Sequence, residues 1–144
     1  MRTLGPARMT GKSPRKRVDA LYWQGRLRAA KAYLESAQQA MLLAEPTQNG
    51  NPIISQIVLA AIAYGDCLTA KRALVINQQD HAAAPRLLRD VLQNTLPDAQ
   101  ERRYRRILGF KDEVQYGARA ASVEEASRLL ADMESFARWA EDLL

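Results

Sequence analysis

The stretch NPIISQIVLAAIAYGDCLTAKRALV, residues 51–75, decides the fold of this chain. Asn51 can cap a helix, and Pro52 suits the first helical position. Between residues 53 and 70, apolar side chains then occupy nearly every side of the helix, with Asp66 as the one charged interruption. A helix that is apolar all round has to be enclosed by other elements. The stretch therefore predicts the central helix of a helical bundle.

A first helix is expected over about 14–43, because its apolar residues form two neighbouring stripes at helical spacing. One stripe contains Trp23, Leu27, Ala30, Leu34, Ala37 and Met41, and the other contains Val18, Tyr22, Ala29, Tyr33 and Ala40. Two adjacent stripes predict a broad buried face.

Three more helices are expected after the central one, which should end near Ile76. The third covers about 81–94 behind Asp80 as a cap, and the fourth covers about 95–116. The last begins at the capping box Ser122-Val-Glu-Glu125. Strand-like alternation is not visible. The chain is therefore predicted to be all-α, an up-and-down bundle of about five helices.

The positive charge of the chain is concentrated at its start. The formal net charge is +5, and residues 1–17 hold six Lys and Arg residues and no acid. Glycines and prolines in the same segment disfavour regular structure. We expect a flexible basic arm over residues 1–16 and a single helical domain over residues 17–144. The arm can touch RNA or an acidic surface, or it can be an inert solvated end.

Composition also bears on the compartment. The single cysteine, Cys67, allows no internal disulfide, and no secretory signal is visible. The near-apolar run is shorter than the roughly 20 residues of a membrane span. These features predict a cytoplasmic protein that does not enter a membrane.

Several segments resemble the HEPN superfamily of small helical bundle proteins, in particular a small bacterial branch. The resemblance rests on AAIAYGDCLTAKRAL (60–74), QQDHAAAPRLL (78–88), RRYRRILGFKDEVQYG (102–117) and the capped last helix. It implies a bundle of four or five helices that is usually a homodimer. Relatives include RNA-cleaving toxins and partners of small nucleotidyltransferases.

The nuclease motif of that superfamily is absent. It consists of Arg, four to six spacers and His. The chain has one histidine, His81, and the positions where the arginine would stand hold Leu74, Val75 and Ile76. The resemblance therefore does not carry ribonuclease activity over to this chain.

Asp66 and Lys111 form the first candidate site. A buried carboxylate needs a partner, and Lys111 lies on the otherwise apolar side of the fourth helix. We expect the two side chains to meet across the bundle as a polar core pair. Arg72 or a tyrosine hydroxyl could serve as the partner of Asp66 instead. In the remaining alternative, Asp66 faces a polar groove and the Lys111 side chain reaches water.

The second candidate is basic. Four arginines flank Tyr104 and could grip phosphates, and the arm adds further cations. The residues concerned are Arg102, Arg103, Arg105, Arg106, Arg15, Lys16 and Arg17. Acids at helical spacing favour the alternative of a salt-bridged, solvated surface, because Glu101 and Arg105 are four residues apart.

Other chemistry finds no support in the sequence. A lone histidine cannot build an ordinary zinc site, and His81 has no evident catalytic partner. No phosphate-binding glycine loop and no nucleophile elbow is present. We expect no catalytic residue, no metal and no cofactor.

The sequence thus predicts a non-catalytic interaction module, a homodimer or the partner of a nucleotidyltransferase-type protein. The alternatives are an RNA-binding protein that uses the arm and the arginine cluster, or a degenerate HEPN-type ribonuclease.

Overall fold

The computed structural model describes residues 14–78, 80–116 and 119–144. The predicted arm lies outside these ranges except for its last residues. Over the described part the chain is an all-α bundle with one small two-stranded sheet, which confirms the predicted fold class. The elements are β1 (Arg15–Arg17), α2 (Tyr22–Leu43), α3 (Asn51–Ala73), β2 (Val75–Asn77), the 3-10 turn η1 (His81–Ala83), α4 (Ala84–Leu92), the 3-10 turn η2 (Gln93–Thr95), α5 (Asp98–Tyr116) and α6 (Val123–Leu143).

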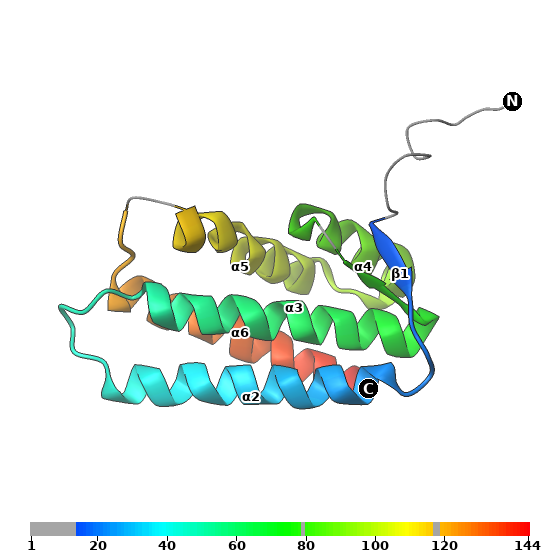
Figure 1. Cartoon of the computed structure of the whole chain (residues 1–144), viewed down its shortest axis with the longest axis horizontal. Coiled ribbons are helices and arrows are strands. Elements are labelled where there is room, and N and C mark those ends of the chain that lie inside the picture. The colour runs from blue at the N-terminus through cyan, green and yellow to red at the C-terminus, as the bar shows by residue number, and fades with distance from the viewer. Residues whose placement is uncertain (1–13, 79, 117–118) are drawn as a thin grey trace, which may run out of the picture.

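Helix α3 is the centre of the bundle, as the sequence predicts. It lies between α2 and α5 and in front of α6 in Figure 1, and α4 packs against it as well. Every residue from 53 to 70 is buried or half-buried. The helix ends at Ala73, three residues earlier than expected, because Leu74 adopts the left-handed conformation with a φ of 57°.

The start of α3 is tied to the start of α6. The Gly50 amide donates to the Ala121 carbonyl at 2.7 Å, and the Ala121 amide donates to Asn51 Oδ1 at 3.0 Å. A Cβ on Gly50 would lie 2.3 Å from the Ser122 carbonyl oxygen, so only a glycine allows these two backbone segments to approach so closely. Gly50 is therefore the cap residue, and Asn51, which we predicted as the cap, instead links two helices. The predicted capping box at Ser122 and Glu125 is confirmed.

A glycine also sets the distance between α3 and α5. A Cβ on Gly65 would lie 2.1 Å from the Tyr104 hydroxyl oxygen, so the ring packs directly on the α3 backbone. Tyr104 is 2% exposed and stacks on Phe136 of α6, with ring centroids 5.2 Å apart. Phe136 in turn packs against Trp139 at 5.3 Å. Three helices therefore meet at Tyr104, which is a core residue and not a base-stacking platform.

The sheet at the end of α3 corrects two sequence predictions. Residues 15–17, expected in the arm and the first helix, form β1 and pair antiparallel with β2, with Lys16 opposite Ile76. The left-handed turn at Leu74 directs the next residues into extended backbone, which the β-branched Val75 and Ile76 favour. The Val18 amide then donates to the Leu74 carbonyl at 3.0 Å, and α2 begins only at Tyr22. The domain therefore includes Arg15 and Lys16.

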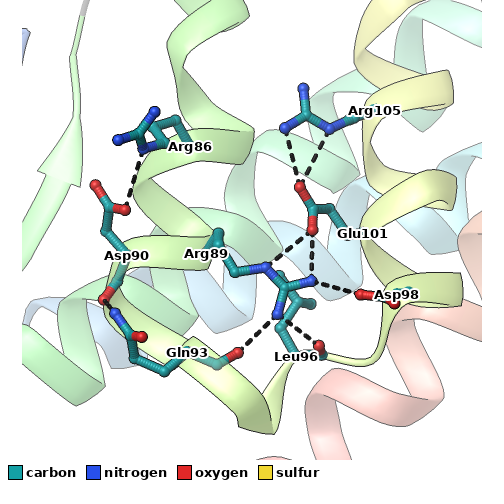
Figure 2. A network of polar contacts seen from close by, with 8 residues as sticks. All are labelled: Arg86, Arg89, Asp90, Gln93, Leu96, Asp98, Glu101 and Arg105. Atoms are coloured by element: carbon teal, nitrogen blue, oxygen red, sulfur yellow. Dashed lines mark hydrogen bonds and ion pairs between the residues drawn. The ribbon is translucent and has the colours of Figure 1, made fainter.

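Arg89 fastens the connection between α4 and α5 (Figure 2). Its Nη1 donates to the Gln93 carbonyl at 2.8 Å and to the Leu96 carbonyl at 2.9 Å. Its Nε and Nη2 donate to the Glu101 carboxylate, and Nη2 also reaches Asp98 at 3.1 Å. One guanidinium thus holds the end of α4, the turn and the start of α5. The predicted third helix is shorter than expected, because η1 and η2 occupy its two ends.

Exchanging glycines for alanine should separate a packing contact from helix propensity. Gly65→Ala should lower the free energy of unfolding by about 1–3 kcal/mol, because the new methyl group displaces the Tyr104 ring. Gly109→Ala on α5, where a Cβ meets nothing within 4 Å, should raise it by about 0.5–1 kcal/mol. Urea unfolding followed by circular dichroism measures both. Equal effects of the two substitutions would contradict the close contact.

Gln93 has a φ of 53° and a ψ of −128°, a conformation in which a side chain is strained. Gln93→Gly should therefore raise the free energy of unfolding by about 1 kcal/mol, although it removes a hydrogen bond from the side chain to the Asp90 carbonyl. The neighbouring Asn94→Gly is the control and should not stabilise, because Asn94 has no positive φ. Stabilisation by Asn94→Gly alone would refute the assigned strain.

Candidate interaction face

One strip of α3 is not fully covered. Its half-buried residues Ser55, Leu59, Ile62 and Asp66 follow at spacings of four, three and four, which places them on one face of the helix. Ser55, Leu59 and Ile62 line a cavity of about 330 Å³ together with Val58 and with Lys111 and Val114 of α5. The helix that is apolar all round therefore keeps one apolar strip partly in contact with water.

Helix α2 borders the strip and is itself only partly covered. Of its two predicted apolar stripes, only Ala30 and Ala37 are buried. The second stripe, which contains Val18, Tyr22, Ala29, Tyr33 and Ala40, is half-buried at every position. The broad buried face that we predicted for this helix is therefore only partly buried within the single chain, although Ala29, Tyr33 and Ala40 pack against the core.

An ion pair joins the two helices along this strip. Arg26 Nη2 lies 3.3 Å from Asp66 Oδ2, and the two side chains are 27% and 13% exposed. Arg26, Tyr33 and Ala40 recur at intervals of seven residues, so they share the side of α2 that faces Asp66. We call the half-buried surface formed by these two helices the α2–α3 face; it contains Arg26, Ala29, Tyr33, Ala40, Ser55, Leu59, Ile62 and Asp66.

The predicted pair of Asp66 and Lys111 within one chain is wrong. Gly65 packs on Tyr104, whereas Lys111 lies against the stretch from Ser55 to Ile62. Residues 104 and 111 are separated by about 10 Å along a helix, at about 1.5 Å per residue. The antiparallel course of α5 therefore carries Lys111 away from Asp66, and Arg26 supplies the counter-ion instead.

Sequence reasoning missed Arg26. Arg26 is a charged residue within the apolar second stripe of α2, as Asp66 is a charged residue within the apolar α3. Two opposite charges that each interrupt an apolar helix face could have indicated this pair. Its Nε is buried and has no hydrogen-bond partner among the described residues. A buried donor without a partner is costly.

Burial controls the protonation of two neighbouring groups on α3. Burial raises the pKa of the Asp66 carboxyl to about 6, and the adjacent Arg26 guanidinium opposes that rise. Burial likewise raises the pKa of the Cys67 thiol to about 11, while Lys71 and Arg26 act in the opposite direction. Cys67 is fully buried and so has the character of an inert core thiol.

A second hollow of about 420 Å³ lies between η1 and α5. It brings His81 together with Arg105 and Lys111, a grouping that sequence reasoning did not find, and Asp80 and Asp112 line the same hollow. Burial and the nearby Lys111 ammonium lower the pKa of His81, so the imidazole is neutral at pH 7. The two carboxylates balance the two cations, and this disfavours the binding of a phosphate.

The arginine cluster is held by acids on two helices. Arg105 Nη2 lies 2.9 Å from Glu101, the carboxylate that also binds Arg89 (Figure 2). Arg106 and Arg103 share Asp132 of α6, with N–O separations of 2.7 Å and 3.6 Å. Most of the cluster therefore matches the salt-bridged surface that was the alternative to nucleic-acid binding. Arg102 is exposed.

The cations of the arm root lie elsewhere. Arg15 Nη2 is 2.8 Å from Asp90 of α4, and Lys16 and Arg17 are exposed on β1. The predicted basic residues are therefore distributed over β1, α5 and the α5–α6 interface. Across residues 14–78, 80–116 and 119–144, no three His, Cys, Asp or Glu side chains gather in a way that could hold a metal ion.

Helix α3 is long and apolar enough, by length and composition, to cross a membrane. Of its most apolar 18-residue window, 72% is buried inside the bundle. A core helix enclosed by its neighbours passes the same test, so the cytoplasmic location stays a prediction.

Comparison of the sequence with models of known protein families gave no match, and comparison with curated proteins gave none. The resemblance to HEPN proteins therefore stays a prediction from the quoted motifs.

Replacing the carboxyl of Asp66 should reveal its raised pKa. From pH 4.5 to 7.5 the folded wild type loses a proton that the unfolded chain, with a pKa near 3.8, has already lost. The wild type should therefore lose stability as the pH rises through 6, whereas Asp66→Asn should not. The difference in unfolding free energy between the two should change by about 1–2 kcal/mol in favour of the variant.

Asp90→Asn serves as the control for this titration. Hydrogen bonds from Arg15 and Arg86 hold the pKa of Asp90 below its ordinary value, so both states are ionised over most of this pH range. Its difference from the wild type should stay nearly constant from pH 5 to 7.5. Parallel curves for the wild type and Asp66→Asn would contradict a buried Asp66.

Proposed function

We propose that this protein is a non-catalytic helical module that acts by binding another protein through the α2–α3 face. The observation that carries the proposal is the half-buried strip Ser55, Leu59, Ile62 and Asp66 on a helix that is otherwise enclosed. A helix that is apolar all round is typically buried on every side. The bundle covers three sides of α3, and a partner would cover the fourth.

The neighbouring surface supports the same function. Ala29, Tyr33 and Ala40 of α2 are half-buried as well, so apolar side chains of both helices remain partly in contact with water. Patches of this kind on a folded protein mark sites of association. Burial of apolar area stabilises a complex by roughly 25 cal/mol per Å² before the costs of association.

Binding of RNA is less well supported. Arg103, Arg105 and Arg106 each have a carboxylate partner, and a phosphate would have to displace it. A catalytic role for the His81 hollow meets the same objection, because Asp80 and Asp112 would repel an incoming phosphodiester. A protein partner, of which the HEPN resemblance suggests a nucleotidyltransferase-type protein as one example, needs none of these charges to be released.

A charge placed on the strip should abolish binding without unfolding the chain. Leu59→Glu puts a carboxylate at the centre of the α2–α3 face, and Leu43→Glu puts one at a position that is 82% exposed at the end of α2. We expect complexes of the wild type and of Leu43→Glu, either self-complexes or complexes captured from the native host, and their loss with Leu59→Glu.

Sedimentation velocity and affinity capture measure the complexes, and circular dichroism shows that each variant keeps its helices. Complexes that survive Leu59→Glu would refute this face as the binding surface. A wild-type chain that forms no complex of either kind would refute the interaction function itself.

A further inference from the structure

We infer that the outer edge of β1 is a second binding site, which takes an extended acidic segment of a partner protein as a third strand of the small sheet. The site lies beyond the end of α3 and not on the α2–α3 face, so the inference goes beyond the proposed function. It follows from the hydrogen-bond register of β1, from the exposure of its residues and from their charge.

The register of the sheet directs backbone groups of β1 outward. Within the described part of the chain, β2 is the one strand that pairs with β1. The Val18 amide donates to the Leu74 carbonyl, and bonded positions alternate along an antiparallel pair, so Lys16 opposite Ile76 also bonds to β2. Arg17 lies between these two positions. Its backbone N–H and C=O therefore point away from β2.

The strand is on the outside of the molecule. All three residues of β1 are exposed, whereas Ile76 of β2 is buried. Strand β2 contacts α3 and α4, and β1 lies at the margin of the bundle in Figure 1. An exposed edge strand can accept another extended chain, because its outward N–H and C=O groups continue the ladder. A short edge offers few backbone bonds, so side chains have to supply part of the affinity.

The charge of β1 indicates which kind of segment fits. Successive side chains of a strand point to opposite faces, so Lys16 lies on one face of the sheet and Arg17 on the other. The nearby Asp90 pairs with Arg15 and Arg86, and none of the ion pairs among the described residues involves Lys16 or Arg17. A segment with two adjacent Asp or Glu residues would place one carboxylate beside each of these two cations.

Other occupants match the edge less well. A second β1 strand would set three cations against three, and like charges directly opposite each other destabilise strand pairing. A nucleic acid could offer phosphates to the cations, but its backbone has no N–H group to donate to the Arg17 carbonyl. Backbone pairing and charge together therefore favour an acidic peptide segment.

Amide hydrogen exchange, followed by NMR on the full chain, tests the strand addition. The probe is the end-blocked peptide Thr-Val-Glu-Glu-Val-Thr at up to about 1 mM, because short peptides bind weakly. We expect exchange of the Arg17 amide to slow by roughly tenfold, whereas the Lys16 amide, already bonded to β2, should change by less than about twofold. No binding, or binding without protection of Arg17, would overturn the inference.

Two substitutions at one position separate charge from backbone pairing. Arg17→Gln removes the cation and keeps the N–H, whereas Arg17→Pro also removes the outward N–H, which β2 does not use. Fluorescence anisotropy of the labelled peptide should show that Arg17→Gln weakens binding by roughly threefold. Arg17→Pro should weaken it by about fivefold more, as expected for one lost hydrogen bond.

Arg102→Gln, at an exposed position of α5, is the matched charge control and should change the affinity by less than about twofold. Circular dichroism shows whether each variant keeps its helices. Equal effects of Arg17→Gln and Arg17→Pro would overturn the backbone pairing.

Other ligands test the acidic character of the segment. The peptide Thr-Val-Lys-Lys-Val-Thr should not bind to the wild type, and a uridine oligonucleotide of the same charge as the acidic peptide should bind more weakly than that peptide. Tighter binding of the oligonucleotide would overturn the inference in favour of a nucleic-acid contact.

The inference and the proposed function can fail separately. Leu59→Glu should leave binding of the acidic peptide unchanged, because Leu59 lies on the α2–α3 face. Absence of peptide binding, with complexes that Leu59→Glu abolishes, would overturn only the β1 site. Peptide binding by a chain that forms no other complex would support the β1 site and overturn the α2–α3 face.

Discussion

The contact between the α3 backbone at Gly65 and the ring of Tyr104 is the constraint on which the rest of the arrangement depends. Because Gly65 has no side chain, α5 can approach α3 closely at this position. The contact also fixes which residues of the two antiparallel helices lie side by side. Lys111 consequently lies against the first half of α3, and Asp66 forms its ion pair with Arg26. The same ring stacks on Phe136, so one side chain positions three helices.

Much of the fold could be predicted from the sequence because it depends on the spacing of residues within single helices. The apolar stretch that became α3, the capping box at Ser122 and the core position of Tyr104 each follow from spacing within one helix. The strand β1 could not be predicted in this way. Three residues are too few to show alternation, and their pairing depends on the left-handed turn at Leu74, which lies 57 to 59 residues further along the chain.

The candidate site was harder to predict than the fold for a related reason. A helical projection tells which residues share a side, but not which helix lies opposite. Asp66 was correctly singled out as a buried carboxylate that needs a partner, and the partner was misassigned because the register of α5 comes from packing. The arginine cluster shows the converse: Glu101 was visible as a partner of Arg105 at four residues' distance, whereas Asp132 lies on another helix.

The enclosed thiol of Cys67 has a practical use. The side chain is fully shielded, and its pKa near 11 keeps almost none of it as thiolate at neutral pH. A thiol reagent can reach the sulfur only when the neighbouring helices separate. The rate at which the reagent labels Cys67 would thus measure how often the bundle opens, and no cysteine would have to be introduced for this measurement.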